Sequence, residues 1–227
     1  RKEWLVAKNS RQTPAKVKDL PGWSKAKELK ASVAIPWDKK KPRRFDEALP
    51  ICNAYPTEES IGFPILFNGD FLVTIDRKQV VWSDSPDSPT GLVKEMIINL
   101  TKSLFVSIAK ENPLVVSELL ETMHQPDNNS LSIHQGSRIF LRQILEALGD
   151  SKFVPLRGGK IGKPRDCHIL AIDEIEADGR LQAQMIDLVP DRSNYLDTEK
   201  LSLLAIEVVS SMGAQSEPVR NFIYHIE

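Results

Sequence analysis

Residues 63–111, FPILFNGDFLVTIDRKQVVWSDSPDSPTGLVKEMIINLTKSLFVSIAKE, combine the signals of a β-strand and of a long helix. The run from Phe63 to Ile75 is rich in apolar and aromatic side chains, which favour β-structure. A charged cluster and a turn-rich segment follow, in which Ser88 is suited to cap a helix and Pro89 to occupy its first position. Beyond them, apolar side chains recur at helical spacing at Val93, Ile97, Leu100, Leu104 and Ile108. The pattern predicts a strand region followed by a long helix over residues 91–111.

Strand and helix patterns are segregated along the rest of the chain. Alternating or β-rich apolar residues predict strands over residues 2–9, 31–37 and 51–55. Helices are predicted over residues 113–123, 137–149 and 198–213, with Ser137 capping the second and either Asp197 or Thr198 capping the third. Two more strands are expected over residues 166–172 and 181–189. Strands that precede helices, with a mixed tail, favour the α+β class over regular alternation.

The pair Asn68 and Gly69 interrupts the apolar run at residues 63–75. An Asn-Gly pair is typical of a two-residue hairpin turn, which would make two strands of this run. A bulge at Gly69 would instead leave one continuous strand. The residues themselves leave both alternatives open.

The composition is that of a globular protein, with 41% hydrophobic and 27% charged residues. No apolar run approaches the roughly 18 residues of a membrane-spanning helix, and the first residues lack the pattern of a signal peptide. The two cysteines, Cys52 and Cys167, suit a reducing compartment, so we expect a cytoplasmic protein. Because the chain begins with Arg1, we expect it to be an internal piece of a longer polypeptide.

The net charge of −1 hides an uneven distribution along the chain. The first 44 residues contain 14 Lys and Arg against four Asp and Glu, a net charge of +10. The densest basic run consists of Lys39, Lys40, Lys41, Arg43 and Arg44. A basic arm of this kind can contact nucleic acid or an acidic domain, and it can equally form solvated loops.

The sequence shows no self-contained catalytic centre. The segment GGKIGKP at residues 158–164 departs from a P-loop, because three residues rather than four separate Gly158 from Gly162 and Pro164 replaces the required Ser or Thr. The four histidines are scattered without the spacing of metal ligands, so no metal site is expected. We therefore do not expect the chain to be a complete enzyme by itself.

A longer segment, ALPICNAYPTEESIGFPILFNGDFLVTIDRKQVVWSDSPDSPTGLVKEMI at residues 48–97, resembles the sacsin-like members of the GHKL ATPase superfamily. The likeness rests on a strand, a turn at YPTEES, Gly-Phe-Pro, an apolar strand and a polar cluster with Arg, followed by an Asp- and Pro-rich segment and a long helix. Upstream, the EWLV and ASVAIP strands occur in the expected order. The resemblance covers about the first 110 residues and is weaker from residue 111 onward. The basic run KKKPRR is longer than the resemblance requires, and SPDSPTG lacks an Asn that is common where the helix begins.

This resemblance implies that the chain is the transducer, or middle, region that follows an ATP-binding domain, as in the heat-shock chaperones to which these ATPases are similar. Residues 1–125 would form a ribosomal-protein-like β-α-β transducer domain, and residues 126–227 a smaller mixed α/β or helical extension. ATP and Mg²⁺ would be bound by the preceding domain of the same polypeptide, since Asp-x-Gly-x-Gly and a glycine-rich lid are absent from this sequence.

In such proteins a basic side chain at the end of a strand contacts the terminal phosphate of ATP and reports its presence. The resemblance places Arg77 in this role, with Lys78 and Gln79 as further candidates to contact the nucleotide. Arginine suits the task because its charge is permanent and its planar fork binds phosphate oxygens in pairs. The alternative is a surface arginine paired with Asp76 or Asp84.

Two other functions are compatible with the sequence. Lys39, Lys40, Lys41, Arg43 and Arg44 could bind nucleic acid in a defence or repair ATPase, although the arm lacks a recognised groove-reading motif. Residues 111–227 could recruit a protein client as an interaction scaffold, and the chain could also form a homodimer.

Overall fold

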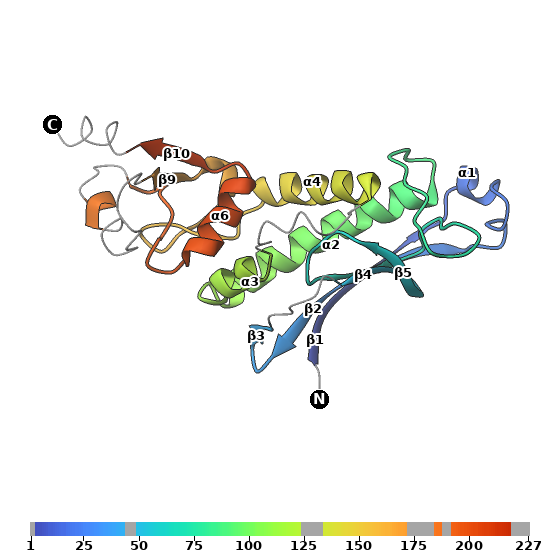
Figure 1. The fold of residues 1–227 in the computed structure, drawn as a ribbon, viewed down its shortest axis with the longest axis horizontal. Helices are drawn as coiled ribbons and strands as arrows, with labels where there is room; N and C mark the ends of the chain where they lie inside the picture. Colours follow the sequence, from blue (N-terminus) through green and yellow to red (C-terminus); the bar gives the residue numbers. More distant parts are fainter. Residues whose placement is uncertain (1–2, 44–48, 124–133, 172–183, 188–191, 219–227) are drawn as a thin grey trace. The chain divides into compact units, whose positions relative to one another are not determined.

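The computed structural model describes residues 3–43, 49–123, 134–171, 184–187 and 192–218, and it belongs to the α+β class (Figure 1). Its contacts divide the chain into two compact units. The first unit comprises Arg1–Ser103 and Gln125–Ile144, and the second comprises Leu104–His124 and Leu145–Glu227. The predicted α+β class is therefore confirmed, whereas the boundary after residue 125 stays a prediction.

The first unit contains a mixed six-stranded sheet in the order β1-β2-β6-β4-β5, with β3 pairing to β2. The strands are β1 (Glu3–Gln12), β2 (Glu28–Asp38), β3 (Lys41–Pro42), β4 (Pro50–Asn53), β5 (Tyr55–Ser60) and β6 (Leu66–Gly69). The neighbours β4 and β6 are parallel, and the other neighbouring strands are antiparallel. The short helix α1 (Ala15–Lys18) lies between β1 and β2 in the sequence.

One face of the sheet supplies the core of the first unit. Alternate residues of β2 are buried on this face, namely Leu29, Ala31, Val33 and Ile35, and each is at most 3% exposed. The same face includes Phe67 of β6, whose ring contacts that of Phe140 with 6.0 Å between the centroids. Period-two burial follows from the alternation of side chains along a strand.

The Asn-Gly alternative of a hairpin turn at residues 68 and 69 is wrong. Both residues lie inside β6 and pair with Ser32 and Ala31 of β2. No register shift is recorded between β2 and β6, so a bulge at Gly69 is not seen there either. A Cβ atom at Gly69 would lie 2.5 Å from Val93 Cγ1, so the glycine permits close packing against the helix that carries Val93.

The long helix predicted from residue 91 is α2 (Pro89–Glu111). Its cap is Ser88, as predicted, because Ser88 Oγ accepts a hydrogen bond from the backbone nitrogen of Gly91 at 2.9 Å. Helix α4 (Gln135–Gly149) begins in the first unit and ends at Gly149, as expected. Ser137 lies within its first turn rather than at the cap, and its hydroxyl instead donates to Glu59.

The second unit combines helices with two short strand pairs. It contains α3 (Val115–Met123), β7 (Val154–Pro155), β8 (Ile161–Gly162), the 3-10 turn η1 (Pro164–Asp166), β9 (His168–Ala171), α6 (Leu203–Ser211) and β10 (Gln215–Pro218). Strands β9 and β10 are parallel, whereas β7 and β8 are antiparallel. The rings of Phe105 and Phe153 meet edge to face, with 5.3 Å between their centroids.

Two predictions for the second unit are wrong. Helix α6 is capped by Ser202, whose side chain accepts from the backbone nitrogen of Ala205 at 3.3 Å, and not by Asp197 or Thr198. Asp197 instead forms an ion pair with Arg157. The strand expected over residues 181–189 is not formed where it is described, since residues 184–186 are helical. None of the helices in the described part of the chain has the length and hydropathy needed to cross a membrane.

Candidate functional site

The residue assigned as the phosphate contact, Arg77, lies at the tip of a tight hairpin formed by residues 72–81, which we call the Arg77 hairpin. The two arms are joined by hydrogen bonds from Val81 N to Leu72 O at 2.7 Å and from Thr74 N to Gln79 O at 2.9 Å. The side chains of residues 75–79 are all exposed. The charged cluster therefore lies away from the core of the first unit.

Hydrogen bonds inside the tip fix the path of the backbone. Asp76 Oδ1 accepts from the hydroxyl of Thr74 at 2.5 Å and from the backbone nitrogen of Lys78 at 3.1 Å. The backbone nitrogen of Arg77 donates to Thr74 O at 2.8 Å. The hydrogen bond from Thr74, followed by that from Lys78 N, lowers the pKa of Asp76. This carboxylate is thus used to shape the turn.

Arg77 has a left-handed backbone with a φ of 60°, which turns the chain sharply at this residue. Among the described residues, no hydrogen bond or ion pair joins its guanidinium to Asp76 or Asp84, the two carboxylates considered as partners. Asp76 bonds within the tip, and Asp84 pairs with Lys94. The hairpin therefore presents an exposed guanidinium while nearby carboxylates are engaged elsewhere.

The two other candidates for nucleotide contact differ from Arg77. Lys78 Nζ pairs with Glu58 Oε1 at 2.7 Å, and this hydrogen bond raises the pKa of Lys78. The backbone also joins these residues, because Glu58 N donates to Lys78 O at 2.8 Å. Gln79 is exposed, and its backbone bonds to Thr74 complete the tip. Lys78 therefore fastens the hairpin to β5.

A buried carboxylate that the sequence analysis missed holds the base of the Arg77 hairpin. Glu59 is 6% exposed and accepts three hydrogen bonds. The donors are Val80 N at 2.8 Å, Trp82 Nε1 at 2.7 Å and Ser137 Oγ at 2.8 Å. Burial of a carboxylate is costly unless its oxygens are satisfied in this way. Glu59 thereby joins β5, the return arm of the hairpin and the first turn of α4.

A second buried charge, Lys94 of α2, lies beside the same tryptophan. Its ammonium group pairs with Asp84 and lies 5.8 Å from the ring centroid of Trp82 and 5.7 Å from that of Phe140. The bond from Lys94, with a further one from Gln143, lowers the pKa of Asp84. The first arm is also tied to α2, since Leu72 N donates to Thr90 Oγ1 at 3.1 Å. Both arms of the hairpin are thus fixed to helices of the first unit.

The residues assigned to nucleic-acid binding lie elsewhere, at the end of β2. Lys39 and Lys40 form the turn between β2 and β3, with φ values of 44° and 89°. Lys41 begins β3, and Arg43 N bonds to Pro36 O at 2.8 Å. Arg44 lies outside the described residues. Binding of nucleic acid by this run stays a prediction.

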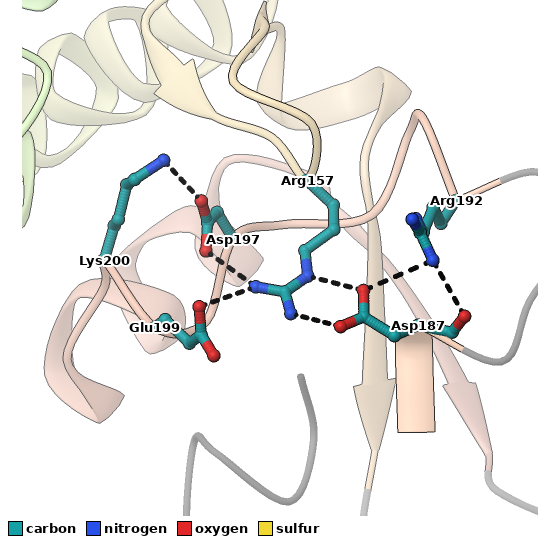
Figure 2. Close-up of polar contacts among 6 residues, drawn as sticks. All are labelled: Arg157, Asp187, Arg192, Asp197, Glu199 and Lys200. Atoms are coloured by element: carbon teal, nitrogen blue, oxygen red, sulfur yellow. Dashed lines mark hydrogen bonds and ion pairs between the residues drawn. The ribbon is translucent and has the colours of Figure 1, made fainter. Parts of the chain in front are cut away.

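The second unit contains a dense charge cluster centred on Arg157 (Figure 2). The guanidinium binds Asp187 through Nε at 3.1 Å and Nη2 at 2.8 Å, and its Nη1 contacts Glu199 at 2.9 Å and Asp197 at 3.4 Å. The hydrogen bonds that Arg157 donates to Asp187 and then to Glu199 raise the pKa of Arg157. Lys200 and Arg192 balance the surplus of carboxylates, as Figure 2 shows. Because the guanidinium makes four hydrogen bonds to carboxylates and its side chain is only 12% exposed, we interpret this cluster as structural.

No group of three or more His, Cys, Asp or Glu suited to a metal ion is found in the part of the chain that the structure describes. Comparisons with models of protein families, with curated proteins and with solved structures give no match to this chain.

Proposed function

We propose that this chain is the transducer region of a sacsin-like GHKL ATPase. In this proposal Arg77 contacts the terminal phosphate of ATP held by an ATP-binding domain of the same polypeptide. The supporting observation is the exposed guanidinium of Arg77 on a hairpin whose other charged residues, Asp76 and Lys78, are already engaged. The mixed sheet and the helices of the first unit are compatible with the proposed ribosomal-protein-like β-α-β transducer.

The chemistry of the tip fits a phosphate. A guanidinium keeps its charge at physiological pH and donates to two phosphate oxygens at once. Arg77 has no ion pair to break among the described residues, whereas Lys78 would first have to release Glu58. Asp76 Oδ1 accepts hydrogen bonds from Thr74 and Lys78 within the tip, so this carboxylate oxygen is engaged by the hairpin. We therefore assign the primary contact to Arg77, and a secondary one to the amide of Gln79.

The attachments of the hairpin provide a route by which phosphate contact could be relayed. The first arm bonds to Thr90 at the start of α2, and the return arm bonds to Glu59, which also holds Ser137 of α4. A displacement of the tip would therefore strain helices as well as strands. In this proposal the helices pass the change on to a protein client.

The preceding domain would bind ATP, which carries the phosphoryl group, and Mg²⁺, which would neutralise part of its charge. This chain would contribute Arg77, which would position the terminal phosphate and stabilise its charge. We place the ATPase in the cytoplasm, where a reducing environment suits the buried thiols of Cys52 and Cys167.

Hydrogen–deuterium exchange on the full-length protein tests the proposed contact. Amides of residues 75–79 should exchange more slowly with a non-hydrolysable ATP analogue than with ADP, because only the former carries the terminal phosphate. The turn at residues 39–41 serves as an internal control and should exchange equally in both states. Equal exchange at residues 75–79 with the two nucleotides would contradict the proposal.

A further inference from the structure

The two edges of the six-stranded sheet are built differently. One edge is β1, which pairs with β2 through ten consecutive residues without a register shift. It contains no proline, and its residues from Lys8 to Gln12 are all exposed. In the described part of the chain β1 pairs with β2 alone.

The opposite edge, β5, carries the features that protect an edge strand. It is six residues long, contains Pro56, and pairs with β4 through an irregular register. The Arg77 hairpin also covers part of it, since Glu58 N donates to Lys78 O at 2.8 Å. Proline, irregular pairing and covering segments are the usual protections against edge-to-edge association. Strand β1 has none of these three features in the described part of the chain, and the charges of Glu3, Lys8 and Arg11 are what it carries at its edge.

A long edge with regular pairing and no covering segment is a template for a strand whose charges complement its own. The charges on β1 indicate which strand would fit. Its charged residues are Glu3, Lys8 and Arg11, so Glu3 and Arg11 lie four residues on either side of Ala7. When two copies of β1 run antiparallel about Ala7, Glu3 of each copy lies opposite Arg11 of the other.

Other registers lose this complementarity. In two copies related by a two-fold axis, odd-numbered residues must lie opposite odd-numbered residues, and even opposite even. A slip of one residue would place core-facing side chains on the opposite face of the sheet. A centre at Lys8 sets that lysine opposite itself, and a centre at Val6 or Asn9 leaves Glu3 and Arg11 unmatched. Only a centre at Ala7 brings opposite charges together across the pair.

The side chains near this centre are available for such contact. Val6 is 44% exposed and would lie opposite Lys8 of the second copy, whose aliphatic stem can cover it. Arg11 pairs with Glu95 at 3.0 Å, but its side chain remains 50% exposed. Its guanidinium can therefore donate to a second carboxylate. We propose that β1 forms an antiparallel homodimer with β1 of a second copy, centred on Ala7, which joins the two sheets.

This proposal goes beyond nucleotide sensing and is tested separately. The mass of the unmodified chain in solution, measured by light scattering or ultracentrifugation over a range of concentrations, should approach that of a dimer as concentration rises. A monomer at every concentration would overturn the proposal.

Cysteine cross-linking then tests the register. Ala7→Cys should give a disulfide-linked dimer under mild oxidation, because the two copies of residue 7 face each other. Asn9→Cys is the matched control: four residues of strand separate its two copies, about 14 Å, whereas a disulfide requires Cα atoms within about 7 Å. The native thiols of Cys52 and Cys167 are buried. Cross-linking through residue 9 in preference to residue 7 would rule out the proposed pairing.

Discussion

Glu59 Oε1 accepts a hydrogen bond of 2.8 Å from the backbone nitrogen of Val80, and this bond fastens the return arm of the Arg77 hairpin to β5. The other oxygen of the same carboxylate binds Trp82 and Ser137. One buried side chain thus links a strand, the hairpin and helix α4. The position of Arg77 depends on this link, although Arg77 itself is exposed.

Substitution of Glu59 by Ala should lower the free energy of unfolding by about 3 kcal/mol, because three buried donors lose their acceptor. Glu59→Gln should cost less, since it keeps one acceptor oxygen. Chemical denaturation followed by tryptophan fluorescence measures both. An equal loss for the two variants would contradict a role that rests on hydrogen-bond acceptance.

Substitution of Arg157 by Ala should destabilise the second unit by about 2 kcal/mol. The change leaves Asp197, whose side chain is 5% exposed, without its guanidinium partner, while solvent screens the more exposed Asp187 and Glu199. Arg165→Ala is the matched control, because its pair with Asp150 is exposed on both sides and should contribute less than about 1 kcal/mol. Denaturation curves that show equal losses for the two variants would argue against the structural role of the Arg157 cluster.

Burial, followed by the hydrogen bond from Tyr195 to Glu217 at 2.5 Å, raises the pKa of the Tyr195 phenol. In the unfolded chain this phenol ionises near its ordinary pKa of about 10. The folded state keeps the proton at higher pH, so the associated stability is present below about pH 10 and is lost as pH rises further.

Tyr195→Phe should remove this dependence. Between pH 10 and pH 11 the free energy of unfolding of the wild type should fall by about 1 kcal/mol more than that of the variant. Urea denaturation at the two pH values gives both numbers. Parallel pH profiles would show that the phenol ionises equally in the folded and unfolded states.

The elements that were predicted correctly are those specified by local signals. Helix α2 has its cap at Ser88, proline at its first position and an unbroken apolar stripe, so neighbouring residues alone determine it. The first half of β2 shows the alternation that burial on one face imposes, with Leu29, Ala31 and Val33 buried.

The features that were missed depend on partners far along the chain. Glu59 resembles a surface residue within YPTEES, and its donors lie 21, 23 and 78 residues away. Asp197 or Thr198 was expected to cap α6. Asp197 instead accepts a hydrogen bond from Arg157, 40 residues earlier in the chain, and Ser202 caps the helix. The pair Asn68-Gly69 favours a turn locally, whereas pairing with β2 keeps it extended. In each case tertiary contacts overrode the local preference.

The most direct test of the proposed function is ATP turnover by the full-length protein with Arg77→Ala. Loss of a charged hydrogen bond to the terminal phosphate should reduce turnover by about 10- to 100-fold while the dissociation constant for ATP stays nearly unchanged. Lys78→Ala, at the neighbouring residue that pairs with Glu58, should retain most of the activity. Turnover by Arg77→Ala equal to that of the wild type would contradict the assignment.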